Sequence, residues 1–277
     1  MTEQNLLGDF LRARRELLQP HEVGLPEGTR RRVPGLRREE VAALAGISPD
    51  YYLRLEQGRD RHPSAQVLGA LADALHLDEE SRAHAAELAR DRARVGRNRP
   101  EAPEKVPPGI QMLLATLNVP AFVLNRYRDI LAVNDLATRL EPSLRVGRNR
   151  LLSLFTDPVA RAYHPDWDAN TATVVAQLRA DIGADATDVG YHALVGELSL
   201  RSERFRQLWA RHDVRRGESA TGTIHHPELG ELQLRREKLA IAGTRLTLVI
   251  HHAQAGTASA ELLGGLASAP RPRVDPD

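Results

Sequence analysis

Residues 36–58 read LRREEVAALAGISPDYYLRLEQG, and this stretch decides the fold of the first part of the chain. Val41 and Ala45 fall on one face of a short helix, and Gly46 follows where a tight turn between helices needs a left-handed backbone. Tyr52 then belongs to the apolar face of a second helix. Small residues where helices cross, a glycine at the bend and one apolar face per helix together predict a helix-turn-helix.

The sequence around this stretch predicts an all-helical domain over residues 1–93. Leu7 and Leu11 repeat at helical spacing, and a long polar loop over residues 19–35 follows them. Ser48 stands where the N-cap of the second helix of the motif is expected. The remaining helices are predicted over residues 38–45, 49–57 and 65–75, with a last helix after residue 78.

The second helix of the motif keeps one face free to read DNA. A helix of this kind enters the major groove, where residues near its N-terminus meet base edges. Arg54 can bind a phosphate or a guanine, while Asp50 either accepts a hydrogen bond from a cytosine amino group or caps its own helix, which is the favoured interpretation. The alternative is a small helical bundle whose arginines are merely solvated. The residues on the free face are Pro49, Asp50, Tyr51, Leu53 and Arg54.

The charges of the chain are segregated although they nearly cancel. The net charge of +1 argues against a uniformly basic coat for nucleic acid. Residues 28–61, however, hold eight arginines against five acids, whereas residues 62–91 hold two arginines against six acids. Arg38 opens the first helix of the motif, where its side chain and the local amides can meet a phosphate. One basic edge is therefore predicted, which is the distribution that binds phosphates.

Length and composition bound the rest of the chain. A length of 277 residues predicts two domains. The absence of cysteine excludes disulfides and thiolate metal sites and fits a cytoplasmic protein. The start of the sequence lacks a signal-peptide pattern, and no apolar run is long enough for a membrane span. We expect a helix-turn-helix domain at 1–93, a proline-rich linker at 94–106, a second domain at 107–255 and a flexible tail at 256–277.

The second domain, at 107–255, is predicted to be an α+β module that ligand-sensing domains also use. A short helix over residues 110–117 precedes two strand-like runs at 121–125 and 129–134, and a helical middle follows. Three further strand candidates are ESATGTIHHP, GELQLRREKLAI and TRLTLVIHHA. This order predicts a five-stranded antiparallel sheet covered by helices on one face, as PAS-like domains have. The fold class is thus mixed, with an all-α helix-turn-helix domain followed by an α+β PAS-like domain.

The helix-turn-helix stretch resembles the XRE-type family, whose pattern runs from an acidic pair through A-G-[IV]-S to [IL]-E-x-G. The segments GTRRRVPGLRREEVA and SPDYYLRLEQGRDRHPS resemble more closely the MmyB-like transcriptional regulators. The resemblance implies that Asp50, Tyr51 and Arg54 face the groove and that Arg30 to Arg32 flank the DNA. The full set of expected DNA-contacting residues is Arg30, Arg31, Arg32, Arg37, Arg38, Ser48, Pro49, Asp50, Tyr51, Arg54 and Arg59.

The second half of the chain carries the same resemblance. The runs FRQLWARHDV and HPELGELQL look like the MmyB-like ligand-binding domain. This resemblance implies a PAS-like pocket for a small, largely apolar, fatty-acid-like molecule. One departure is Arg236, where the resemblance implies an aromatic residue, so the size or polarity of a pocket lined by this position would differ.

Three residues are candidates for contact with that effector. Asn134 lies between a strand and a helix, so it either faces a ligand or caps the helix. Trp209 and His212 share a helix face and can border one site, or they form a hydrogen-bonded core. Tyr163, His164 and Trp167 form a second cluster, which is interpreted as a helix end and wall.

Catalytic and metal chemistry are set aside. The pairs His225-His226 and His251-His252 could lie on neighbouring strands, but adjacent strand residues point to opposite faces, so each pair offers at most one inward ligand. No nucleophile elbow, phosphate-binding glycine loop or metalloprotease motif occurs in the sequence. We therefore expect no enzyme, no metal and no cofactor.

The sequence favours a bacterial one-component transcription regulator with DNA and a small-molecule effector as partners. Helix-turn-helix modules often act as dimers, so a homodimer on a near-palindromic operator in double-stranded DNA is expected, with no membrane partner. Two alternatives stay open at this point. One is a helical module that binds a protein partner, and the other is a DNA-binding protein with an enzymatic C-terminal domain.

Overall fold

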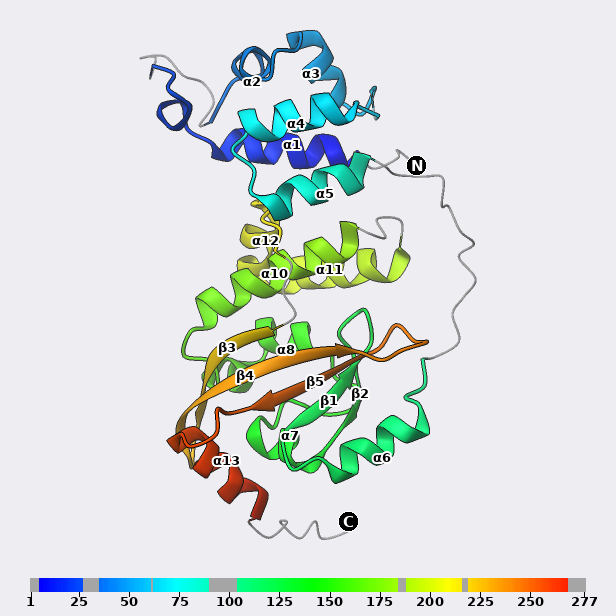
Figure 1. The fold of residues 1–277 in the computed structure, drawn as a ribbon, viewed down its shortest axis with the longest axis vertical. Coiled ribbons are helices and arrows are strands. Elements are labelled where there is room, and N and C mark those ends of the chain that lie inside the picture. Colours follow the sequence, from blue (N-terminus) through cyan, green and yellow to red (C-terminus); the bar gives the residue numbers. More distant parts are fainter. Residues whose placement is uncertain are drawn as a thin grey trace. The chain divides into compact units, whose positions relative to one another are not determined.

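The computed structural model describes the chain over residues 5–26, 35–60, 62–89, 104–183, 188–215 and 219–268. The chain, drawn as a ribbon in Figure 1, divides into two compact units. Each unit has an apolar core of its own. The first unit gathers Met1–Arg97, Ala172–Val189 and Glu203–Arg216, and the second gathers Asn98–Thr171, Gly190–Ser202 and Gly217–Asp277.

The first unit is helical. Its helices are α1 (Leu6–Leu17), the 3-10 helix η1 (Pro20–Val23), α2 (Arg38–Leu44), α3 (Pro49–Glu56), α4 (Ala65–Ala74), α5 (Glu79–Ala89), α12 (Glu203–Ala210) and most of α10 (Trp167–Gly183). The helices predicted over 38–45, 49–57 and 65–75 are confirmed, each ending one residue earlier than expected. η1 adds one turn to the predicted loop.

Apolar side chains from distant parts of the sequence form the core of this unit. Phe10 and Leu11 of α1 are 1% exposed and pack with Tyr52 and Leu55 of α3, which are 0% exposed. Leu71 of α4 joins the same cluster. Burial of such side chains supplies most of the stability of short helices, which are marginal by themselves.

The turn between α2 and α3 has the geometry that the sequence predicts. Gly46 has a φ of 66°, in the left-handed region. The amide of Ile47 donates to the carbonyl of Ala42 at 2.9 Å, which closes the end of α2. Ser48 then caps α3, because its side chain accepts a hydrogen bond from the amide of Tyr51 at 3.1 Å. The helix-turn-helix prediction is confirmed.

The second unit contains a five-stranded antiparallel sheet, as predicted. The strands are β1 (Ala121–Leu124), β2 (Ile130–Val133), β3 (Ser219–His226), β4 (Gly230–Ala240) and β5 (Thr247–His252), and they lie in the order β2-β1-β5-β4-β3 (Figure 1). The further helices are α6 (Pro108–Thr116), α7 (Asp135–Leu140), α8 (Arg150–Thr156), α9 (Pro158–Ala162), α11 (Val189–Arg201) and α13 (Ala258–Ser268).

Helices cover both faces of this sheet, which corrects the expected cover on one face. Val123 packs in a cluster with Leu114 of α6, whereas its neighbour Phe122 packs in a cluster with Ala137 of α7. Adjacent strand residues point to opposite faces. All four residues of β1 are apolar and buried, so both of its faces need a cover. The continuous apolar run at 121–124 was the signal for this arrangement.

The segment expected to be a flexible tail contains a helix instead. α13 begins two residues after Gly256. Its Leu263 and Leu266 are buried and pack with Leu232 and Leu234 of β4. These two leucines lie three residues apart, on one face of the helix. Their burial stabilises the helix, although the surrounding Ala, Gly and Ser indicated a flexible segment. Residues 269–277 lie outside the described part of the chain.

Candidate nucleic-acid interface and effector residues

The exposed face of α3 carries a small polar cluster. Asp50 and Arg54 lie one helical turn apart and form an ion pair, with side-chain exposures of 72% and 44%. The guanidinium carbon of Arg54 lies 5.6 Å from the centre of the Tyr51 ring. Tyr52 and Leu55 point to the opposite side, into the core. The fold therefore fixes which face of α3 is free, and it brings together three of the residues predicted to read DNA.

Two predicted roles at the start of α3 are settled by the capping geometry. Ser48 is the N-cap residue, so its hydroxyl is engaged with the backbone of its own helix. Asp50 was expected to cap the helix, and this was wrong, because the carboxylate of Asp50 pairs with Arg54 instead. Asp50 still lies in the first turn, where a negative charge favours the helix. Pro49 is exposed at the first helical position.

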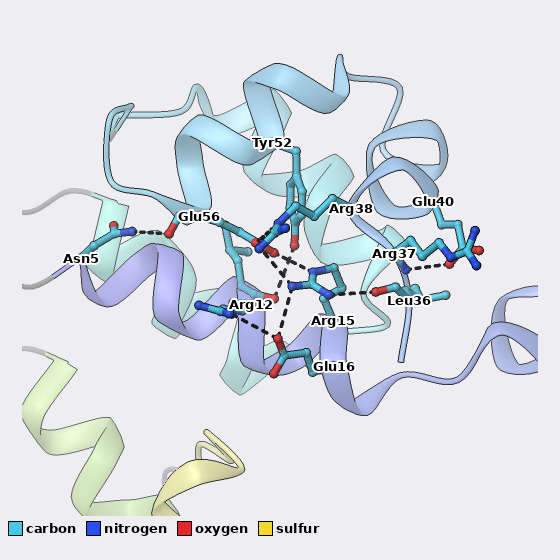
Figure 2. Close-up of polar contacts among 11 residues, drawn as sticks. Asn5, Arg12, Arg15, Glu16, Leu36, Arg37, Arg38, Glu40, Tyr52 and Glu56 are labelled. Carbon is cyan, nitrogen blue, oxygen red and sulfur yellow. Dashed lines mark hydrogen bonds and ion pairs between the residues drawn. The ribbon is translucent and has the colours of Figure 1, made fainter. Parts of the chain in front are cut away.

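A buried ion network ties the motif to α1 (Figure 2). Glu56, whose side chain is 2% exposed, accepts from Nε of Arg15 at 2.6 Å and from Nε of Arg38, also at 2.6 Å. Nη1 of Arg15 donates in addition to the carbonyl of Leu36 at 2.9 Å. The phenol of Tyr52 lies beside this network, and burial together with the charge of Glu56 raises its pKa.

Sequence reasoning missed this network. Glu56 is the acid of the [IL]-E-x-G pattern, and Arg15 lies 41 residues earlier in the chain. The only signal was that a charged residue, Glu56, directly follows the core residue Leu55. Arg38 was predicted to meet a phosphate, and its side chain, which is 41% exposed, is already hydrogen-bonded to Glu56.

Of the other arginines expected to contact DNA, some are exposed around α3 and some lie outside the described residues. Arg37 is exposed at the N-cap of α2, where its amide donates to Glu40 at 2.7 Å. Arg59 is exposed after α3. Arg30, Arg31 and Arg32 lie outside the described residues. The described part of the motif thus presents Arg37, Arg54 and Arg59 as accessible cations around α3.

Trp209 and His212 border one cluster, as predicted, and a third residue lies between them. Arg179 of α10 is 8% exposed, and its guanidinium carbon lies 3.8 Å from the centre of the Trp209 ring. Its Nη1 lies 3.1 Å from Nδ1 of His212. The ring of Phe205 stacks on that of Trp209, with centroids 5.6 Å apart. The predicted alternative of a hydrogen-bonded core describes this geometry.

Burial dominates the electrostatics of this cluster. It lowers the pKa of His212 to about 3, and the charge of Arg179 lowers it further. Burial also lowers the pKa of Arg179 to about 9, against the opposing effect of Asp213. Asp213 itself pairs with Arg14 of α1 at 3.1 Å. His212 is therefore neutral and Arg179 is charged at neutral pH.

Asn134 belongs to the second unit, whereas Trp209 and His212 belong to the first. Its side chain caps α7, accepting from the amide of Ala137 at 3.0 Å, and also accepts from the amide of Ala121 at 3.0 Å. Its Nδ2 donates to the carbonyl of Val119 at 2.8 Å. Asn134 therefore caps the helix, as one of its two predicted roles required. Asn134 also lines a cavity of about 530 Å³ with residues of α6, β2 and α7.

The second polar-aromatic cluster separates into three environments. Tyr163 packs in the apolar cluster of α13 and β4. Trp167 donates from its indole nitrogen to the carbonyl of Leu154 at 2.9 Å, consistent with a wall. His164 lies 3.5 Å from Glu141, which is 0% exposed. His164 directly follows Tyr163, the C-cap residue of α9, so the predicted helix end is confirmed, and its side chain joins a buried ion cluster.

The two histidine pairs lie on β3 and β5, which are separated by β4, so the pairs are not on neighbouring strands. One histidine of each pair, His226 and His251, is buried. Within the described ranges, no three side chains of His, Asp or Glu are grouped as metal ligands.

Among the helices that the structure describes, none is long and apolar enough to span a bilayer.

Two family profiles match the chain. The profile of the MmyB-like transcription regulator ligand binding domain matches residues 106–266, which is more than half of the 277 residues. The profile of a helix-turn-helix domain matches residues 6–85, the segment that contains α1 to α5. No curated protein matches the chain.

Proposed function

The chain belongs to the MmyB-like transcription regulators, a family of regulators and not of enzymes, and from that premise we propose that it is a one-component regulator. Residues 1–93 would read DNA, and the domain at 107–255 would bind a small, largely apolar effector. A regulator of this kind acts where the DNA is, so we place it in the cytoplasm. The effector must bind two states of the protein with different affinity if it is to control DNA binding.

The free face of α3 is the observation that carries the proposed DNA contact. Tyr52 and Leu55 fix one side of this helix in the core, which leaves Asp50, Tyr51 and Arg54 outward. We propose that α3 lies in the major groove and that Arg54 leaves Asp50 to contact a guanine or a phosphate. Arg37 and Arg59, both exposed, are proposed phosphate contacts.

We propose further that the protein binds as a homodimer to a near-palindromic operator. A single helix-turn-helix contacts few base pairs, and two copies on half-sites about one DNA turn apart multiply the specificity. The net charge of +1 supports this arrangement, because bulk electrostatic attraction to DNA is weak for such a chain. Base contacts and dimerisation must then supply much of the affinity.

The test begins with sites selected by the full-length protein from random duplexes. Affinity for a selected site and for random DNA is then measured over a range of salt concentrations. We expect a preference for the selected site, a two-fold symmetric sequence, and a fall of affinity with salt that corresponds to a few phosphate contacts per protomer. Absence of binding to any duplex at low salt would overturn the proposal and favour a helical module for a protein partner.

The effector is tested on the same protein. Native mass spectrometry identifies any small molecule that copurifies, and operator affinity is compared after its removal and after its restoration. We expect operator affinity to change with the molecule. An unchanged affinity would remove the sensor role and leave the DNA-binding role standing.

A further inference from the structure

Two helices from the second half of the chain belong to the first unit. α12 and most of α10 lie within residues 106–266, which match the ligand binding domain profile, yet they belong to the compact unit that contains the helix-turn-helix. Ala180 of α10 and Val214, which follows α12, are each 6% exposed and pack in the same apolar cluster as Phe10 and Tyr52. The core around the proposed DNA-reading motif therefore includes side chains from the ligand-binding part of the chain.

An ion pair accompanies this apolar contact. Nη1 of Arg14 in α1 lies 3.1 Å from Oδ1 of Asp213, and the two side chains are 19% and 36% exposed. His212, just before Asp213, has a φ of 55°, in the left-handed region, so the chain turns directly before this contact. Solvent and salt screen a partly buried pair less than a fully exposed one. The segment after α12 is thus joined to α1 by charge as well as by apolar packing.

The next residue of α1 makes a corresponding contact with α3. Arg15 pairs with Glu56 at the end of α3, and Asn5, the N-cap residue of α1, donates from its Nδ2 to the carbonyl of Glu56 at 2.8 Å (Figure 2). α1 therefore holds the end of α3 from both its first and its last turn. Because Arg14 and Arg15 are consecutive in one helix, a movement of α1 at Arg14 also moves its contact with α3.

The docked position of α12 leaves the reading face of α3 open. The side chains of Asp50 and Arg54 are 72% and 44% exposed while α12 packs in the same unit. Docking of α12 therefore does not cover the residues proposed to meet DNA. It adds contacts to α1 and so restricts the placement of α3. The docked arrangement is accordingly the one that favours DNA binding, because a preorganised surface loses less entropy when it binds.

We propose that Arg14 and Asp213 are positioning residues for DNA binding. Their ion pair docks the ligand-binding part of the chain on α1 and, through the adjacent Arg15 and Glu56, sets the placement of α3. Release of this contact lowers operator affinity, which supplies the two states that control by an effector requires. The inference rests on the proposed DNA-binding function and names the contact through which the rest of the chain acts on it.

The first test is Asp213→Asn in the full-length protein. Removal of an acid makes the protein more positive, so bulk electrostatics alone would tighten its binding to any DNA. We expect the opposite for the selected operator, a weakening of about five-fold or more, which is the lower end of ordinary coupling between sites. Affinity for random DNA should stay the same or rise. Competition binding with operator and random duplexes measures both affinities.

Arg211→Gln is the matched control for this variant. Arg211 pairs with the same carboxylate at 3.0 Å, but it belongs to the same segment as Asp213, and its side chain is 57% exposed. Its removal leaves the contact with α1 in place. Operator and random DNA should therefore lose affinity to the same small extent, with discrimination between them unchanged.

A double-mutant cycle tests whether the two residues act as a pair. Arg14→Gln combined with Asp213→Asn should lose no more discrimination than Asp213→Asn alone, because either change removes the same contact. Arg14→Lys keeps the positive charge and should retain most of the wild-type discrimination. Additive losses in the double variant would mean that the two residues act independently, and the positioning role of their pair would be overturned.

Hydrogen exchange without DNA separates positioning from a general loss of stability. Asp213→Asn should speed exchange at the amides of α1 and α3, whereas α4, which packs against α2 and α5, should keep its wild-type rates. An equal acceleration in α4 would show general destabilisation and overturn the inference. Unchanged exchange in α3, or unchanged operator affinity, would overturn it as well. If the wild type selects no duplex, the proposed DNA-binding function fails, while exchange at α3 still decides whether the pair positions this helix.

Discussion

Arg15 and Glu56 form a buried ion pair across 41 residues of sequence, with Nε of Arg15 at 2.6 Å from Oε1 of Glu56 and side-chain exposures of 4% and 2%. This pair joins α1 to the end of the helix proposed to read DNA. Arg38 of α2 binds the second oxygen of the same carboxylate. One acid therefore links all three helices whose relative placement presents α3 (Figure 2).

Glu56→Gln should strongly destabilise the helix-turn-helix. The substitution leaves the buried guanidinium of Arg15 with the longer contact to Glu16, at 3.4 Å and 45% exposed, and removal of one partner of a buried pair costs about 3–5 kcal/mol. The measurement is native-state hydrogen exchange at the amides of α1 and α3, which reports on this part of the chain alone. Asp73→Asn is the control, because Asp73 is 74% exposed in its pair with Arg82 and should contribute less than about 1 kcal/mol. Similar losses in the two variants would contradict the role given to the buried pair.

Arg54→Ala should weaken binding to the selected operator by about 1–3 kcal/mol and reduce discrimination against random DNA. The expected loss is that of a base contact made by a side chain on the free face of α3. Arg12→Ala is the control, since Arg12 is exposed on α1 in an i,i+4 pair with Glu16. Competition binding with operator and random duplexes measures both quantities. Unchanged discrimination in Arg54→Ala would remove Arg54 from the base-reading residues.

Two glycine substitutions should change stability in opposite directions. Gly46 has a φ of 66°, so an alanine there is strained by about 1–2 kcal/mol, although no atom lies within 4 Å of the added Cβ. Gly69 lies inside α4, also with open space around its Cβ position, and an alanine there should stabilise the helix by about 0.5–1 kcal/mol. Hydrogen exchange at the amides of α3 and α4 gives the two signs. Equal effects of the two substitutions would show that the turn does not need its left-handed residue.

The parts of this fold that were predictable depend on local patterns. The turn at Gly46 and the cap at Ser48 each depend on residues within four or five positions of one another, so the local sequence is enough to predict them. The five strands were also recognisable, since each carries its own apolar pattern and turn signals. For Asn134 and Trp209 the sequence left two roles open, contact with a ligand or a role in the fold. In the structure Asn134 caps α7, and Trp209 packs in a cluster with Arg179.

The features that escaped prediction depend on pairing across the fold. The partner of Glu56 lies on α1, and nothing near Glu56 in sequence identifies Arg15. Arg236 stood out only as a departure from a family pattern, and its position opposite His251 required the strand register. The placement of α13 similarly depends on the leucines of β4, which a composition rich in Ala, Gly and Ser does not reveal. Long-range partners decide these positions, and the local sequence does not name them.

The buried neutral His212 should make the first unit less stable in mild acid. Burial and the charges of Arg179, His84 and Arg14 lower its pKa from 6.5 to about 3, so the folded state resists a proton that the unfolded chain accepts. Stability from this group is fully present above pH 6.5 and is lost as the pH falls toward 3, by at most about 1.4 kcal/mol per pH unit.

His212→Asn should therefore flatten the stability of α12 between pH 6.5 and pH 4.5, the part of this window above the ordinary pKa of a carboxylate. Asparagine tolerates the φ of 55° at this position and can accept a hydrogen bond from Arg179. Hydrogen exchange at the α12 amides over this pH range, corrected for intrinsic rates, is the measurement. His225→Asn, an exposed position on β3, is the control and should retain the wild-type slope. An unchanged slope in His212→Asn would mean that another group takes up the proton, and the assignment to His212 would fail.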